Sequence, residues 1–135
     1  MVCVYCGYET RVTNSREQKR SNKVWRRRKC LRCLAIFTTL EEADYSIALR
    51  VEEDNQFKPF LTDLLYTEVL VALEHRKTAY SDARELTSTI IKNLLASPAS
   101  PLFKPSDISK ATADVLKKFD TRAWHRFAAE HPSVS

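Results

Sequence analysis

The sequence predicts an α+β protein in which a small N-terminal module of short β-strands precedes a mainly helical domain with a small β-hairpin. All four cysteines of the 135-residue chain lie in two CxxC pairs, CVYC at 3–6 and CLRC at 30–33. Residues 1–39 carry ten Lys and Arg against two Asp and Glu, whereas residues 40–135 carry twelve against fifteen. Helical periodicity begins near residue 61. We therefore predict two domains, 1–43 and 44–135.

The cysteine pairs predict a metal site. Each CxxC turn aims two sulfurs at one point, so two such turns can close a tetrahedral site for one structural Zn²⁺ ion. The 23 intervening residues slightly exceed the usual spacing of roughly 15–20 but leave room for a hairpin. Structural disulfides are disfavoured in a reducing cytosol, and thiol redox chemistry would need only one pair, at a helix start. The expected zinc ligands are Cys3, Cys6, Cys30 and Cys33.

A block of cations separates the two pairs. Strand-forming residues occur at 11–15 and 35–40. Of the fourteen residues at 16–29, between these two segments, eight are Lys or Arg and only Glu17 is acidic. This density predicts binding to the phosphates of double-stranded DNA, and arginine can also pair with guanine in the major groove. An acidic protein partner and a disordered solubilising segment are the alternatives for this block.

The second domain should begin with two short strands within 45–60, joined by a turn at 53–55. Four helices should follow, and 97–103 should be a loop because it is rich in proline and serine. The first helix should span 61–77. The expected N-caps of the other three are Ser81, Ser106 and Asp120.

No catalytic constellation is evident. The single glycine excludes glycine-rich phosphate loops, and the three histidines lack metal-site spacing. No apolar run approaches the about 20 residues of a membrane span, and the N-terminus does not resemble a signal peptide. We therefore expect a cytoplasmic protein that is neither an enzyme nor bound to a membrane.

The pattern CxxC…SR…RRRKCxxC…FTT resembles that of the NrdR family, bacterial repressors of ribonucleotide reductase genes that join a zinc ribbon to an ATP-cone domain. The likeness continues in KPF at 58–60, ALEHR at 72–76 and KKFDTRAWHRFA at 117–128. It implies that the four cysteines bind zinc and that the ribbon binds operator DNA. The residues expected to contact DNA are Ser15, Arg16, Lys19, Arg20, Arg26, Arg27, Arg28 and Lys29.

The cone departs from the family pattern. Glu52 and Leu64 stand where lysines expected to face a triphosphate are usual. A carboxylate there would repel the phosphates. The nucleotide contacts that the resemblance still implies are Val51, Arg76 and Trp124. We expect the cone fold to persist, with binding of ATP or dATP weakened, altered or absent.

The leading interpretation is a zinc-ribbon repressor that binds duplex DNA as a homo-oligomer, a dimer or larger, paired through its second domain. The alternative is an interaction adaptor that places the ribbon on an acidic partner without binding specific DNA or nucleotide. A nucleotide-modifying or thiol-redox enzyme is the third interpretation. Binding to a random duplex separates the first two, because an adaptor would show negligible affinity.

Overall fold

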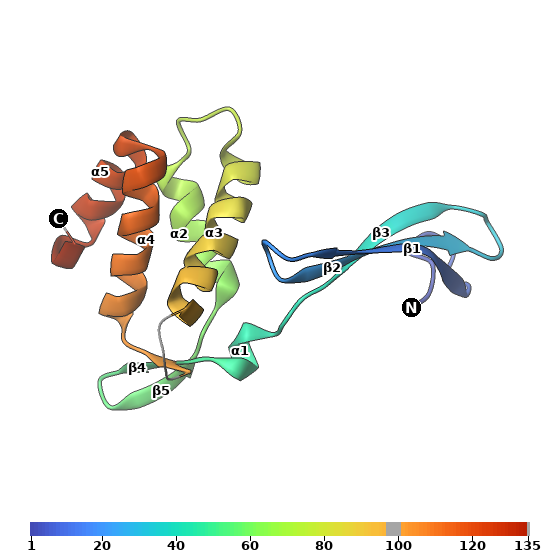
Figure 1. Ribbon diagram of the computed structural model, residues 1–135, viewed down its shortest axis with the longest axis horizontal. Helices are drawn as coiled ribbons and strands as arrows, with labels where there is room; N and C mark the ends of the chain where they lie inside the picture. Colours follow the sequence, from blue (N-terminus) through green and yellow to red (C-terminus); the bar gives the residue numbers. More distant parts are fainter. Residues whose placement is uncertain (97–100, 135) are drawn as a thin grey trace. The chain divides into compact units, whose positions relative to one another are not determined.

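The computed structural model describes residues 1–96 and 101–134, and its α+β fold confirms the predicted class (Figure 1). The chain divides into two compact units, Met1–Ala43 and Asp44–Ser135. We call the first the ribbon and the second the helical unit, and describe each by itself. Within the described residues, no helix is long and apolar enough to cross a membrane.

The ribbon is a three-stranded antiparallel sheet in the order β1-β2-β3 (Figure 1). Its strands are β1 (Thr10–Gln18), β2 (Lys23–Cys30) and β3 (Ile36–Glu41). The central strand β2 contains the whole arginine run, although the sequence predicted strands only at 11–15 and 35–40. The sequence did not predict β2, because cations at successive positions remove the polar–apolar alternation by which a half-buried strand is identified.

The helical unit begins with a small mixed sheet in the order β5-β4-β6. β4 (Arg50–Glu53) and β5 (Gln56–Pro59) form the predicted hairpin, and Asp54 and Asn55 adopt φ of 53° and 61° in its turn. Two positive φ values are typical of a type I′ hairpin turn, which Asp and Asn tolerate.

A one-turn helix and a short strand of this unit were not predicted. Residues Tyr45–Ala48 form a one-turn helix, α1, capped by Asp44, whose carboxylate accepts the Ser46 N–H at 3.0 Å. The second is β6 (Leu102–Phe103), which pairs in parallel with β4 inside the segment expected to be a loop. Residues 97–100 of that segment lie outside the described chain.

Four helices follow: α2 (Thr62–Ala72), α3 (Ala79–Ala96), α4 (Pro105–Phe119) and α5 (Thr121–Glu130) (Figure 1). A 3₁₀ turn spans Pro132–Val134. The prediction for the first helix was too long, because α2 ends at Ala72 rather than at 77 and a turn segment leads to α3.

Of the predicted caps, one is correct and two are wrong. The Asp120 carboxylate accepts the Ala123 N–H at 3.0 Å and caps α5. Ser81 lies inside α3, which starts earlier, where the Thr78 hydroxyl donates to Asp82 at 2.6 Å. Lys104, not Ser106, is the N-cap of α4, because Pro105 has the fixed φ and missing N–H that suit the first helical position.

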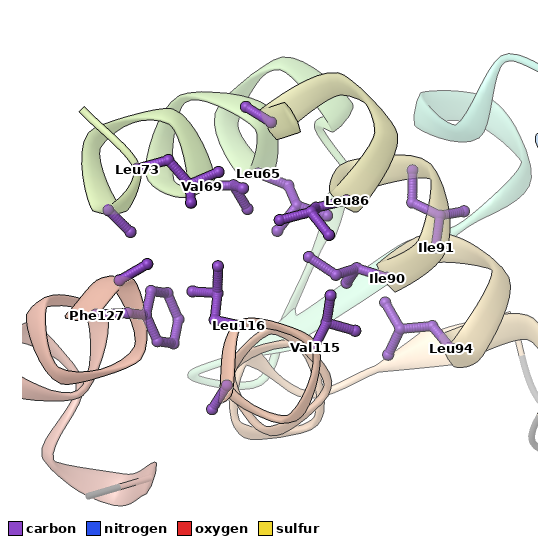
Figure 2. Close-up of a cluster of buried hydrophobic side chains, with 14 of the residues drawn as sticks. Leu65, Val69, Leu73, Leu86, Ile90, Ile91, Leu94, Val115, Leu116 and Phe127 are labelled. Carbon is purple, nitrogen blue, oxygen red and sulfur yellow. The ribbon is translucent and has the colours of Figure 1, made fainter. Parts of the chain in front are cut away.

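The core of the helical unit lies between α2, α3, α4 and α5. Figure 2 shows side chains from all four helices pointing into one cluster. Val69, Leu73, Ile90 and Leu116 have no exposed surface there. The unit therefore has a hydrophobic core of its own.

Asp120 links the α4–α5 junction to the turn that follows α2. Its Oδ2 lies 3.1 Å from His75 Nε2 and accepts from Arg76 Nη1 at 3.0 Å. Arg76 Nε also donates to Asp82 at 2.8 Å. The Ala123 amide, with His75 and Arg76, lowers the pKa of Asp120 to about 2 despite the opposing effect of burial.

We predict that Asp120→Ala lowers the free energy of unfolding of the helical unit by about 1–2 kcal/mol at neutral pH, the usual cost of losing an N-cap. Because the folded pKa is depressed, this contribution is complete above the ordinary carboxyl pKa of about 4 and is lost as pH falls toward the folded value. Urea unfolding followed by circular dichroism at neutral pH and near pH 2 measures it. Asp114→Ala, on an exposed position of α4, is the control. A deficit of equal size at both pH values would contradict the prediction.

Candidate metal centre and nucleic-acid interface

The four cysteine sulfurs converge in the ribbon, all within 4.8 Å of one another. Cys3 Sγ and Cys33 Sγ are 3.7 Å apart, and Cys6 Sγ and Cys30 Sγ are 3.5 Å apart. Zn–S bonds of about 2.3 Å in a tetrahedron place the sulfurs about 3.8 Å from one another. The donor set and its spacing therefore fit a zinc ion.

Two similar turns present these sulfurs. In the first, Gly7 follows the CxxC pair with φ of 73°, and the Tyr5 N–H donates to Cys3 Sγ at 3.4 Å. In the second, Leu34 occupies the equivalent position with φ of 61°, and the Arg32 N–H donates to Cys30 Sγ at 3.3 Å. Amide donors of this kind favour the thiolate, the form that binds metal.

The surroundings of Cys30 and Cys33 shift the pKa values of these two thiols in opposite directions. Burial raises the pKa of Cys30, but the amides of Arg32 and Cys33 and the neighbouring thiols outweigh it and lower the pKa to about 6. The Ala35 amide lowers the pKa of Cys33, but burial and the other thiols outweigh it and raise the pKa to about 12. A divalent cation would remove this competition by attracting every thiolate.

The ribbon has almost no hydrophobic core. Over residues 1–43, all of which the structure describes, only Cys3 and Cys30 are buried. Large apolar side chains such as Tyr5 and Leu34 are 71% and 61% exposed. The convergence of the sulfurs is thus the main tertiary feature that joins the N-terminal turn to the sheet.

The strand register divides the cations between two faces of the sheet, because directly paired residues point to the same side and neighbours along a strand alternate. A bulge at Thr13 sets the β1 register, so that Val12 pairs with Arg28 and Asn14 with Arg27. We name the two faces the bridged face and the open face. The bridged face consists of Thr10, Val12, Ser15, Glu17, Val24, Arg26, Arg28, Phe37, Thr39 and Glu41. The open face consists of Arg11, Asn14, Arg16, Gln18, Lys23, Trp25, Arg27, Lys29, Ile36, Thr38 and Leu40.

Arginines of the bridged face bind other side chains of the sheet. Arg26 donates from Nη1 to Ser15 Oγ at 2.7 Å and from Nη2 to Glu41 Oε2 at 2.8 Å. It therefore joins all three strands. Arg28 donates to Thr10 Oγ1 at 3.3 Å.

Cations of the open face lie largely free of carboxylates. Within the ribbon, Arg11, Arg16, Arg27 and Lys29 have no carboxylate oxygen within 4.0 Å, and Lys23 pairs with Glu42 at 3.0 Å. The remaining predicted DNA contacts, Lys19 and Arg20, are exposed in the turn between β1 and β2. The predicted DNA-binding residues thus lie on two faces and a turn rather than on one surface. Arg11, which was not among the predicted contacts, shares the open face.

The three residues expected to contact nucleotide lie in different surroundings. Val51 lines a cavity of about 440 Å³, to which Leu64 also contributes. The described residues that line this cavity do not include Arg76 or Trp124. Arg76 instead pairs with two aspartates, and Lys117 Nζ lies 5.0 Å from the Trp124 ring centroid.

The cavity is lined by Glu53 rather than by its neighbour Glu52. Glu52, expected to face a bound triphosphate, does not line the cavity, whereas Val51 and Glu53 do. Side chains alternate along β4, so Glu52 points to the opposite side of the strand. Glu53 is paired with Lys58 at 3.0 Å.

Comparison with known proteins finds a matching family model and similar proteins. Residues 1–41 match a family model described as "Transcriptional repressor NrdR-like, N-terminal domain". A protein from Symbiobacterium thermophilum named Transcriptional repressor NrdR is 35% identical over 130 residues, 96% of this chain and 85% of the relative. A relative with the same name from Petrotoga mobilis is 32% identical over 96% of this chain and 86% of the relative. Another from Chlamydia trachomatis serovar L2 is 30% identical over 95% of this chain and 82% of the relative.

We predict that Arg26→Ala lowers the free energy of unfolding of the ribbon, because it removes the side chain that joins the three strands. Arg26 and Glu41 are 34% and 66% exposed, so the loss should be about 0.5–1 kcal/mol. Arg27→Ala is the matched control, since Arg27 has no carboxylate partner in the ribbon. Amide hydrogen exchange over Val24–Lys29 reports the difference. Equal loss of protection in the two variants would count against this role for Arg26.

Proposed function

The chain belongs to the NrdR family of transcriptional repressors, and we propose that it is a zinc-dependent repressor that binds double-stranded DNA through its ribbon. The observation that supports the proposal is that four clustered cysteines lie at the end of a sheet whose central strand contains Arg26, Arg27 and Arg28. Four thiolates would bind one Zn²⁺ and leave no open position for catalysis, so the ion supplies rigidity. The family is one of regulators rather than of enzymes.

The proposed ligands are Cys3, Cys6, Cys30 and Cys33, and the proposed targets are ribonucleotide reductase genes, as the family resemblance implies. One ribbon offers a small contact surface. We place the protein in the cytoplasm as a homo-oligomer, a dimer or larger, in which the helical units pair two ribbons on neighbouring DNA sites. Pairing makes the second contact intramolecular and so raises overall affinity.

The cavity beside Val51 suits a nucleoside triphosphate poorly. Its one lysine, Lys58, is paired with Glu53, and Glu68 adds a half-buried carboxyl group whose pKa is raised by burial. The N-terminal residues of two helices, Leu61 before α2 and Pro105 of α4, also line the cavity, and helix N-termini attract phosphate. We propose that ATP and dATP bind weakly, through backbone groups without support from cationic side chains.

We predict that removing zinc with a chelator lowers affinity for DNA more than tenfold, because the ribbon unfolds without its metal. Fluorescence anisotropy with a random-sequence duplex at moderate salt measures the affinity. The helical circular dichroism should persist, since the helical unit has its own core. Zn²⁺ should restore binding and Mg²⁺, which prefers oxygen ligands, should not. Undiminished binding by zinc-free protein would refute the proposed mechanism, and absence of binding by the zinc-loaded protein would favour an adaptor.

We predict that isothermal titration with ATP or dATP gives a dissociation constant weaker than micromolar. Leu64→Lys should tighten binding about fivefold, because one partly exposed charge pair contributes about 1 kcal/mol. Leu95→Lys is the matched control, since Leu95 is similarly exposed on α3 and does not line the cavity. Micromolar binding by the unaltered protein would contradict the prediction.

A further inference from the structure

We propose that the open face of the ribbon is the surface that meets DNA, that Arg27 at its centre reads bases, and that Arg11, Arg16 and Lys29 around it hold phosphates. The bridged face, with Arg26 and Arg28, holds the sheet together instead. This inference rests on the proposed function, because it specifies which residues of the ribbon carry DNA binding.

The first support is the charge on each face. Within the paired strands, the open face carries five cations and no carboxylate, whereas the bridged face carries two arginines and two glutamates. Glu42, which lies beyond the end of β3, pairs with Lys23, so four of the five cations have no carboxylate partner in the ribbon. Affinity for a polyanion follows uncompensated charge, because each neutralised phosphate releases a condensed counterion. The open face is therefore the one with electrostatic attraction for a duplex.

The second support is the availability of hydrogen-bond donors. Both terminal nitrogens of Arg26 already donate within the sheet, to Ser15 and Glu41. Contact with DNA would break bonds that join the strands. Arg27 is exposed and has no side-chain partner in the ribbon, so its guanidinium is free to pair. Neighbouring residues of one arginine run thus have opposite roles because they point to opposite sides of β2.

The third support is the arrangement of rows across the open face. The register aligns Asn14, Arg27 and Thr38 in a central row, one residue from each strand. Adjacent strands lie about 4.8 Å apart, so the row spans about 10 Å, comparable with a major groove about 12 Å wide. Asparagine, arginine and threonine side chains can all hydrogen-bond to base edges, and arginine pairs bidentately with guanine.

The two rows beside it carry the remaining contacts. One aligns Arg16, Trp25 and Leu40. The other aligns Arg11, Lys29 and Ile36. Cations at the margins of a polar centre suit phosphates at the two edges of a groove, whereas the apolar members can contact sugars and thymine methyl groups. The central row therefore determines sequence preference and the outer rows supply affinity.

The test compares four single variants of the full, zinc-loaded chain on two duplexes, one selected from a random pool by the unaltered protein and one with its sequence scrambled. Zinc content and circular dichroism confirm folding at the assay temperature. Arg27→Ala should lower affinity for the selected duplex at least tenfold and bring the two affinities close together. Arg27→Lys, which keeps the charge, should also reduce this preference but retain the salt dependence.

Arg11→Ala should weaken binding to both duplexes alike and reduce the slope of log affinity against log salt by about 0.9, the value for one phosphate contact. Arg26→Ala should change neither the preference nor the slope. Arg11→Ala and Arg26→Ala therefore each remove one positive charge, from opposite faces of the same sheet. Because both variants are compared in their folded, zinc-loaded form, a difference in slope between them reports the DNA contact.

The inference is overturned if folded Arg26→Ala loses slope or preference while Arg27→Ala retains both. If Arg27→Ala weakens binding to the two duplexes equally, its base-reading role is overturned and Arg27 is a phosphate contact. An unaltered protein that selects no duplex from the pool overturns the proposed function and this inference together.

Discussion

The ribbon depends on the convergence of four sulfurs, because little else in it can hold a fold. Its only buried residues are Cys3 and Cys30, and a small sheet without an apolar face is at best marginally stable in water. Cys30 ends β2, so a metal bound there would fix the register of the central strand. A slip of one residue would exchange the two faces. The same constraint would therefore maintain both the fold and the separation of free from bridged arginines.

The two units reach stability by different routes. The helical unit buries apolar side chains from four helices around Leu73, Ile90 and Leu116 (Figure 2). The ribbon, held at one metal site, needs few apolar positions, and its strands can carry cations at densities that a conventional core would not permit. This difference accounts for the charge asymmetry of the chain. It also explains why metal removal should affect DNA binding while leaving most secondary structure intact.

Several features set by neighbouring residues were predictable from the sequence, although the caps expected at Ser81 and Ser106 were wrong. Features set by distant pairing were not predictable. The spacing of the cysteines, the Asp54–Asn55 turn and the Asp120 cap are local, and the sequence identified each. Strand β2 was missed because its cations obscure alternation, and β6 because its parallel pairing with β4 is non-local. The two-faced distribution of the arginines depends on the register and on the bulge at Thr13. Arg76 likewise pairs with Asp120, 44 positions away, and this long-range pairing could not be foreseen.

Amide hydrogen exchange, measured with and without bound zinc, tests most directly whether the metal holds the sheet. We predict that zinc-free protein exchanges the amides of β1, β2 and β3 at the rates of an unfolded chain, while α2, α3, α4 and α5 keep their protection and serve as an internal reference. Protection of the ribbon strands that is unchanged by metal removal would show that the sheet is stable by itself and would contradict this account.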